Sequence, residues 1–145
     1  MSLNDVCVDA SLAVAWLFDE PFSKNADALR REWREKGIRM IGPAQFHAEV
    51  TSAIRKRVYF KEILPEEGEL VFSVYLDVPI RIIDGTEVYR KAWELTKEFN
   101  QPVCYDMLYL AVAEIEDCEL WTCDKSLVNS MKGKSERVRW VGEAR

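Results

Sequence analysis

The stretch "DVCVDASLAVAWLF", residues 5–18, decides the fold of this chain. Residues 5–9 form a short run rich in β-branched side chains, which is typical of a strand, whereas residues 11–18 have an apolar pattern typical of a helix. A strand that leads directly into a helix is the repeating unit of parallel sheets that are covered by helices on both faces. Asp9 stands at the junction of the two elements.

The same alternation continues to the end of the chain. Further strands are predicted at 38–41, 80–83, 119–123 and 137–141. Helices are predicted at 22–36, from Pro43 and from Pro65 onward, and at 86–99, 105–116 and 125–131. No repeat or linker divides the chain. We therefore expect an α/β fold, an α/β/α sandwich around a mostly parallel sheet of about five strands, formed by one domain over residues 1–145.

Two local patterns give finer predictions. In the helix that starts at Pro65, the apolar residues expected to face the core are Leu70, Val71, Val74 and Tyr75. Asp84, with Glu87 three residues later, resembles a capping box that would begin the helix at 86–99.

Composition excludes several classes of protein. The chain has 145 residues, of which 48% are hydrophobic and 31% charged, as is ordinary for a globular protein. Its formal net charge of −5 provides no bulk attraction to nucleic acid. No stretch approaches the roughly 18–20 apolar residues that span a bilayer, so no membrane association is expected. The N-terminus has an acid within its apolar run and no basic region, which argues against a signal peptide and favours a cytoplasmic location.

Cysteine and histidine usage excludes further chemistry. The four cysteines form no C-x-x-C pair, and His47 is the only histidine, so we expect no zinc site. A single histidine and the lack of G-x-S-x-G also make a Ser-His-Asp hydrolase improbable. We expect the cysteines to be reduced and to serve as small apolar residues.

Four acidic residues stand where a site would form. Asp9 and Asp124 directly follow predicted strands, and residues just beyond the carboxyl ends of parallel strands line the crevice where ligands bind. Asp106 lies near the start of an otherwise apolar helix, where the helix dipole favours negative charge. Glu49 lies beside the apolar stripe of its helix, so it can point along the sheet edge toward the same crevice.

Each acid also has a purely structural explanation. Asp9, Asp106 and Asp124 are each placed to cap the helix that follows, and Glu49 by itself would be an ordinary solvated helix residue. Only the joint pattern indicates a site.

The segments around these acids resemble the signature segments of PIN-domain nucleases, in the same order and spacing. They are "VDAS" (8–11), "P-x-x-F-x-x-E-V" (43–50), "YDMLYLAVAE" (105–114) and "WTCDKSL" (121–127). Among PIN-domain proteins, the chain looks most like the virulence-associated (VapC-like) toxin nucleases of toxin–antitoxin pairs. It departs from them at Ser52, where relatives often have Asn.

The resemblance implies an endoribonuclease that hydrolyses RNA phosphodiester bonds with Mg²⁺, for which Mn²⁺ can substitute. The positions matching Asp9 and Asp106 would be the surest metal ligands, and those matching Glu49 and Asp124 would complete the catalytic cluster. Ser11 and Thr122 fall where relatives carry hydroxyls that orient a carboxylate or water. A small antitoxin and a homodimeric assembly are the partners that the resemblance implies.

These residue types suit magnesium, a hard cation that prefers a few carboxylates and keeps several waters. Carboxylates crowded together repel one another, so a divalent cation would relieve the repulsion that keeps some of them protonated. Bound metal would also lower the pKa of a coordinated water and neutralise charge on the phosphate.

Cations for the RNA backbone are less clearly marked. Arg55, Lys56 and Arg57 precede two aromatic residues, a combination suited to single-stranded nucleic acid, and Lys125 follows the fourth acid. A solvated helix end, favoured by the helix dipole, would explain the first three equally well.

Two rival families that also place acids at strand ends need different residues near Asp9. Receiver-like phosphotransfer domains have an acidic doublet where Asp9 is followed by Ala10, and haloacid-dehalogenase-type phosphatases need a second Asp where Ser11 stands. Both are disfavoured. Two functions within the same fold stay open: a catalytically silent module that binds RNA or protein, and a housekeeping RNA-processing nuclease without an antitoxin.

Overall fold

A five-stranded parallel sheet forms the centre of the computed structural model, which describes residues 1–143. The strand order is β3-β2-β1-β4-β5, and every neighbouring pair is parallel. The strands are β1 (Asp5–Val8), β2 (Arg39–Gly42), β3 (Ile80–Ile82), β4 (Glu119–Thr122) and β5 (Val138–Trp140). The predicted α/β architecture is therefore confirmed, and the sheet is parallel throughout.

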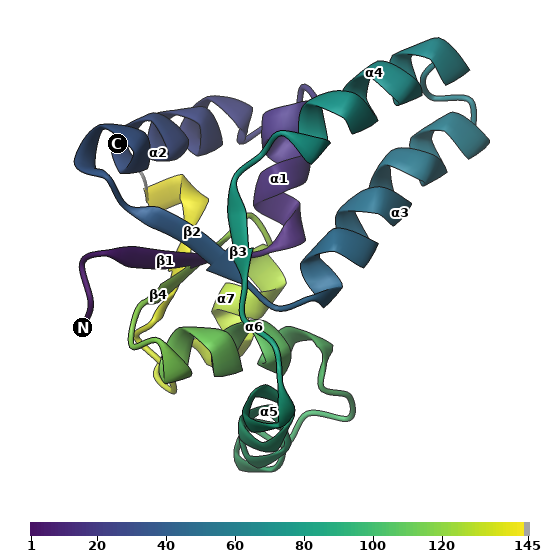
Figure 1. Ribbon diagram of the computed structural model, residues 1–145. Coiled ribbons are helices and arrows are strands. Elements are labelled where there is room, and N and C mark those ends of the chain that lie inside the picture. The colour runs from purple at the N-terminus through teal and green to yellow at the C-terminus, as the bar shows by residue number, and fades with distance from the viewer. Residues whose placement is uncertain (144–145) are drawn as a thin grey trace.

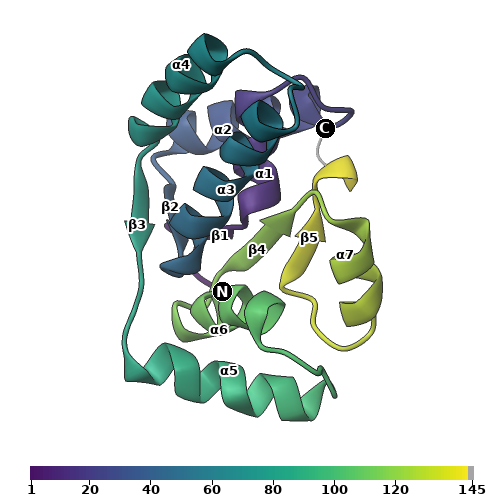
Figure 2. The same cartoon turned by 90° about the vertical axis from the view of Figure 1, so that its right-hand side faces the viewer.

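Helices cover both faces of the sheet (Figures 1 and 2). In the part of the chain that the structure describes, the α-helices are α1 (Ala10–Leu17), α2 (Ser23–Lys36), α3 (Gln45–Tyr59), α4 (Pro65–Leu76), α5 (Thr86–Glu98), α6 (Tyr105–Ile115) and α7 (Lys125–Met131). Helices α1 to α4 lie on one side of the sheet, and α6, backed by α5, lies on the other. None of the helices in residues 1–143 has the length and apolar character needed to cross a bilayer.

Local sequence signals set several element boundaries. The Asp9 side chain caps α1 by accepting a hydrogen bond from the Leu12 N–H. Gly37 ends α2 in the left-handed conformation, with φ of 67°, which glycine adopts without strain. Pro65 is the first residue of α4, where its missing N–H costs nothing.

The core is built around β1 and α6. Strand β1 lies in the middle of the sheet, and its Cys7 and Val8 side chains are fully buried. Every residue of α6 from Met107 to Ala113 is buried, because the helix is enclosed between the sheet and α5. An all-round apolar helix of this kind belongs in an interior position. The start of α6 is therefore held firmly against the carboxyl ends of the strands.

Helices α3 and α4 form a hairpin that projects from the body of the molecule (Figure 1). The two helices approach closely at Gly68, where an added Cβ would overlap the Val58 side chain. Tyr75 points back toward the body, is 3% exposed, and lies at hydrogen-bonding distance from His47 on α3.

Three local expectations are wrong. In α4 only part of the predicted stripe faces inward, since Leu70 is 67% and Val74 52% exposed. The cause is the position of Gly68, which must face α3 and thereby fixes the rotation of α4. Helix α5 begins after Gly85 without a side-chain cap, so Asp84 does not form the predicted capping box. Helix α3 begins at Gln45, two residues after Pro43.

The strand order changes direction between β1 and β4. The chain builds the sheet outward from β1 to β2 and β3, and then returns to place β4 and β5 on the other side. In open α/β sheets, such a switch point leaves a crevice at the carboxyl ends of the two strands. Asp9 follows β1 and Asp124 lies two residues after β4, so the fold brings two of the predicted acids to this crevice.

Candidate functional site

Asp9 is the most enclosed of the four acids, with only 7% of its surface exposed. Its Oδ1 accepts hydrogen bonds from the Ser11 hydroxyl at 2.5 Å and the Leu12 N–H at 3.3 Å, and its Oδ2 accepts one from the Thr122 hydroxyl at 2.5 Å. Burial raises the pKa of Asp9 from 3.8 to about 6, and the nearby charge of Glu49 adds to the rise, although the hydrogen bonds oppose it. The capping explanation is thus correct for Oδ1, while Oδ2 faces β4.

Ser11 and Thr122 tie the ends of β1 and β4 together. The Thr122 oxygen accepts a hydrogen bond from the Asp124 N–H at 2.9 Å, and the Ser11 oxygen accepts one from the Cys123 N–H at 2.9 Å. Each hydroxyl therefore donates to Asp9 and accepts from the backbone that leads to Asp124. This network fixes the orientation of the buried carboxylate.

Asp124 caps α7. All of the hydrogen bonds of its side chain use Oδ1, which accepts from the backbone N–H groups of Ser126 and Leu127 and from the Ser126 hydroxyl. Oδ2 has no hydrogen-bond partner among the described residues. Capping therefore occupies one carboxylate oxygen of Asp124 and leaves the other available on the crevice side.

Asp106 occupies the first turn of α6, but it does not cap the helix. Its side chain is exposed, unlike the residues that follow it, so its charge is not buried in the apolar helix as the sequence alone implied. Partial burial, and then the neighbouring charge of Asp124, raise its pKa. Asp106 has a charged neighbour of the same sign and no cationic partner among the described residues.

Glu49 lies in the second turn of α3 and is held by a residue of its own helix. The Gln45 amide donates to Glu49 Oε1 at 2.5 Å and to the backbone carbonyl of Tyr105 at 2.9 Å. Desolvation raises the pKa of Glu49, and the charge of Asp106 adds to the effect, whereas Gln45 and the nearby Tyr109 hydroxyl lower it. Glu49 therefore faces the start of α6 rather than bulk solvent alone.

The four acids form a row of neighbours rather than a closed cage. Asp9 interacts electrostatically with Glu49, Glu49 with Asp106, and Asp106 with Asp124. Within residues 1–143, no three acidic, histidine or cysteine side chains are close enough to enclose one ion as they stand. The atoms that these side chains offer to a metal ion are all carboxylate oxygens. Besides burial, repulsion between like charges raises the pKa of the carboxyl groups of Asp9, Glu49 and Asp106. Such a set fits a hard cation that one or two carboxylates bind while it keeps most of its waters.

The basic residues considered for RNA binding lie in two places. Arg57 is paired with Glu20 and lies over the Phe18 ring, and Arg55 lies over Tyr59. These two and Lys56 belong to the outer half of α3, on the projecting hairpin and away from the acids. Lys125 follows Asp124 at the start of α7, with its ammonium group 3.6 Å from the centre of the Trp140 ring.

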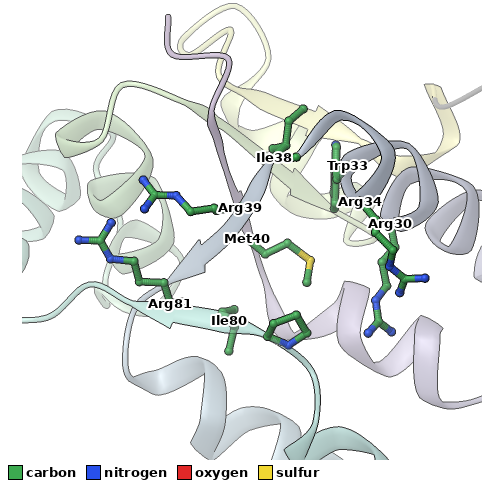
Figure 3. Close-up of a pocket in the computed structure, with 10 residues that line it drawn as sticks. Arg30, Trp33, Arg34, Ile38, Arg39, Met40, Ile80 and Arg81 are labelled. Carbon is green, nitrogen blue, oxygen red and sulfur yellow. The ribbon is translucent and has the colours of Figure 1, made fainter.

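A cavity of about 520 Å³ lies elsewhere, between α2 and the amino-terminal ends of β2 and β3. Figure 3 shows Arg30 and Arg34 of α2 on one side of its apolar floor, which includes Met40 and Ile80. None of the four acids lines it. The acids lie at the opposite ends of the strands, so this cavity is not the site to which the sequence motifs point.

Comparison with known proteins gives the family. The family model described as "PIN domain" matches residues 6–130. This chain belongs to the PIN domain family. Ribonuclease VapC12 of Mycobacterium tuberculosis, found in two strains, is 31% identical to this PIN domain over 125 residues, which cover 86% of the chain and 91% of the relative. The resemblance to VapC-like PIN-domain nucleases is confirmed.

Solved structures of PIN-like fold agree. VapC20 of Mycobacterium tuberculosis, described as a Sarcin-Ricin loop cleaving toxin, superimposes with a TM-score of 0.63 at 15% identity, covering 86% of this chain and 94% of its own. PAE2754 from Pyrobaculum aerophilum gives a TM-score of 0.60 at 17% identity, covering 95% and 90%. At these identities the two structures support the fold alone.

Sequence reasoning missed two residues that contact the acids of this PIN domain. Gln45 precedes Glu49 by one helical turn and so shares a helix face with it, and that spacing was the available signal. Tyr109 lies near Glu49 only because α6 meets α3, so local spacing gave no signal for it. Neither residue type attracts attention as a ligand, and the bond from Gln45 to α6 depends on a tertiary contact.

Proposed function

We propose that this chain is a metal-dependent endoribonuclease that hydrolyses RNA phosphodiester bonds and acts as the toxin of a toxin–antitoxin pair. The observation that carries the proposal is the row of Asp9, Glu49, Asp106 and Asp124 at the switch point of the sheet. Membership of the PIN domain family and the 31% identity to a VapC ribonuclease support it.

In the proposed mechanism, one or two of these carboxylates would bind Mg²⁺, or Mn²⁺ in its place, directly, and the others would bind it through its waters. The bound ion would neutralise charge on the scissile phosphate and favour ionisation of a coordinated water for in-line attack. Asp9, whose orientation Ser11 and Thr122 fix, supplies a rigid ligand from β1 and α1. Asp106 and Asp124 would be further ligands, and the repulsion between their charges favours cation binding.

The RNA itself needs positive charge that the acidic site lacks. Lys125 is placed best, because it directly follows Asp124. Arg55, Lys56 and Arg57 can contact only RNA that extends along α3, and Arg57 must first give up its bond to Glu20. We therefore propose that Lys125 contributes to binding near the scissile bond and the α3 residues bind flanking RNA.

An antitoxin would cover apolar surface. Exposed apolar side chains on α4 are Leu70, Val74 and Leu76. Leu70 and Val74 lie one helical turn apart and so share a face, and exposed apolar side chains on one face are typical of a protein-binding surface. Other apolar side chains of α1 and α4 and of the residue after α1 pack against the core instead, namely Trp16, Leu17, Phe18, Val71, Phe72 and Tyr75. We propose that the outer face of α4 contacts the antitoxin, and a homodimeric assembly stays a prediction.

The test is cleavage of total RNA with mapping of the new ends. We expect cleavage with Mg²⁺ or Mn²⁺ that EDTA abolishes, and loss of cleavage in Asp9→Asn and Asp106→Asn. Asp84→Asn is the matched control, because Asp84 is an exposed acid outside the site. Undiminished cleavage by the Asp9→Asn/Asp106→Asn double variant would overturn the assignment. Growth arrest on expression of the chain alone supports a toxin, and harmless expression of active enzyme supports a housekeeping nuclease.

A further inference from the structure

Gln45 links helices α3 and α6 beside the acids. Helix α3 packs against α1 and α4, whereas α6 packs against α5 and strands β1, β2 and β4. The Gln45 amide nitrogen bridges them, because it donates both to Glu49 on α3 and to the Tyr105 carbonyl on α6. That carbonyl belongs to the residue before Asp106. The bridge therefore sets the spacing between the Glu49 and Asp106 carboxylates.

Two buried polar atoms beside Glu49 lack a hydrogen-bond partner among the described residues. They are Gln45 Oε1 and the Tyr109 hydroxyl oxygen. The Tyr109 hydroxyl lies near enough to Glu49 to lower the pKa of the Glu49 carboxyl group. The two groups nevertheless do not meet the geometry of a hydrogen bond. Buried polar atoms without partners cost folding free energy, and a native structure retains few of them. Their presence next to one carboxylate indicates that something else completes their hydrogen bonding.

We propose that Gln45 and Tyr109 are positioning residues that hold Glu49 for a hydrated divalent cation. A hydrated cation brings waters that donate hydrogen bonds, and Gln45 Oε1 is a buried acceptor for one of them. The Tyr109 hydroxyl is a donor that would hold the Glu49 carboxylate in place when a cation is bound. The inference rests on the proposed function, and it adds two residues that bind no metal themselves.

The variants that test it are Gln45→Met and Tyr109→Phe, which keep the size of each side chain and remove its polar group. Their matched controls are Gln101→Met, whose amide donates to the Phe99 carbonyl, and Tyr89→Phe, which is exposed on α5. Binding of Mn²⁺ is measured by titration with detection of free Mn²⁺ by electron paramagnetic resonance. Thermal melting in EDTA measures the stability of the metal-free protein.

Each test variant should bind Mn²⁺ about tenfold more weakly, the effect expected for groups that orient metal ligands. The melting temperature of Tyr109→Phe in EDTA should be unchanged or higher, because the variant removes a hydroxyl with no partner among the described residues. RNA cleavage by both variants should return to the wild-type rate at saturating Mn²⁺. The controls should match the wild type throughout.

The inference is overturned if both variants bind Mn²⁺ as tightly as the wild type. It is also overturned if their Mn²⁺ binding falls only in step with a lower melting temperature, since that result marks a structural role. A wild-type chain that neither binds Mn²⁺ nor cleaves RNA would refute the proposed function itself. A wild-type chain that does both, with variants that match it, would refute only the positioning role.

Discussion

Asp9→Asn is expected to stabilise the metal-free protein at neutral pH while abolishing its activity. The folded protein binds the Asp9 proton more tightly than the unfolded chain does, because the pKa rises from 3.8 to about 6. At roughly 1.4 kcal/mol per unit of pKa difference, the ionised carboxylate destabilises the folded protein by about 3 kcal/mol.

The direction of the pH dependence follows from the raised pKa. Below pH 3.8, Asp9 is protonated in both states and costs nothing, and as the pH rises the unfolded state ionises first and is favoured. The destabilisation reaches about half of its full value near pH 5 and is complete above about pH 7. An asparagine at this position avoids the destabilisation because its amide is neutral. The amide can still accept hydrogen bonds from Ser11 and Leu12, and it can donate one to the Thr122 oxygen.

The assay is urea unfolding in EDTA, followed by tryptophan fluorescence, at pH values from about 5 to 8. The free energy of unfolding of Asp9→Asn should exceed that of the wild type, and this difference should grow by roughly 1.5 kcal/mol from pH 5 to pH 8. Saturating Mg²⁺ should shrink the advantage by stabilising only the wild type. Asp84→Asn, which replaces an exposed acid outside the site, is the control for the loss of one carboxylate. A constant or narrowing advantage for Asp9→Asn would refute the reasoning.

Two further substitutions test the hydrogen-bond network around Asp9 and the hairpin formed by α3 and α4. Thr122→Val removes the donor to Asp9 Oδ2 and the acceptor for the Asp124 N–H, so Mn²⁺ affinity should fall on the order of tenfold. Unchanged affinity in a calorimetric titration would contradict a role for this hydroxyl. Gly68→Ala forces a Cβ against Val58 and should lower the free energy of unfolding by about 1–3 kcal/mol, with RNA cleavage preserved. Equal stability in urea would show that the hairpin adjusts freely.

Local pattern predicted most elements because each strand and helix has a distinct hydrophobic period. The prediction fails in α4, where apolar residues occupy nearly all sides from Leu70 to Leu76 and no single face stands out. Contact with α3 at Gly68 decides which of them face inward. The start of α5 shows the same limit, since Gly85 rather than Asp84 stands at its N-cap.

The order of residues along the chain was sufficient to indicate a parallel α/β fold and to single out Asp9, Asp106 and Asp124, because strand ends and helix starts can be recognised locally. Glu49 was indicated by its place beside the apolar stripe of its helix. Tertiary structure alone decided how enclosed each acid is, with Asp9 buried and Asp106 exposed. It also decided that Gln45 reaches α6 across 60 residues of sequence. The physical reason is that burial and long-range hydrogen bonds depend on which surfaces meet, and no local pattern specifies those meetings.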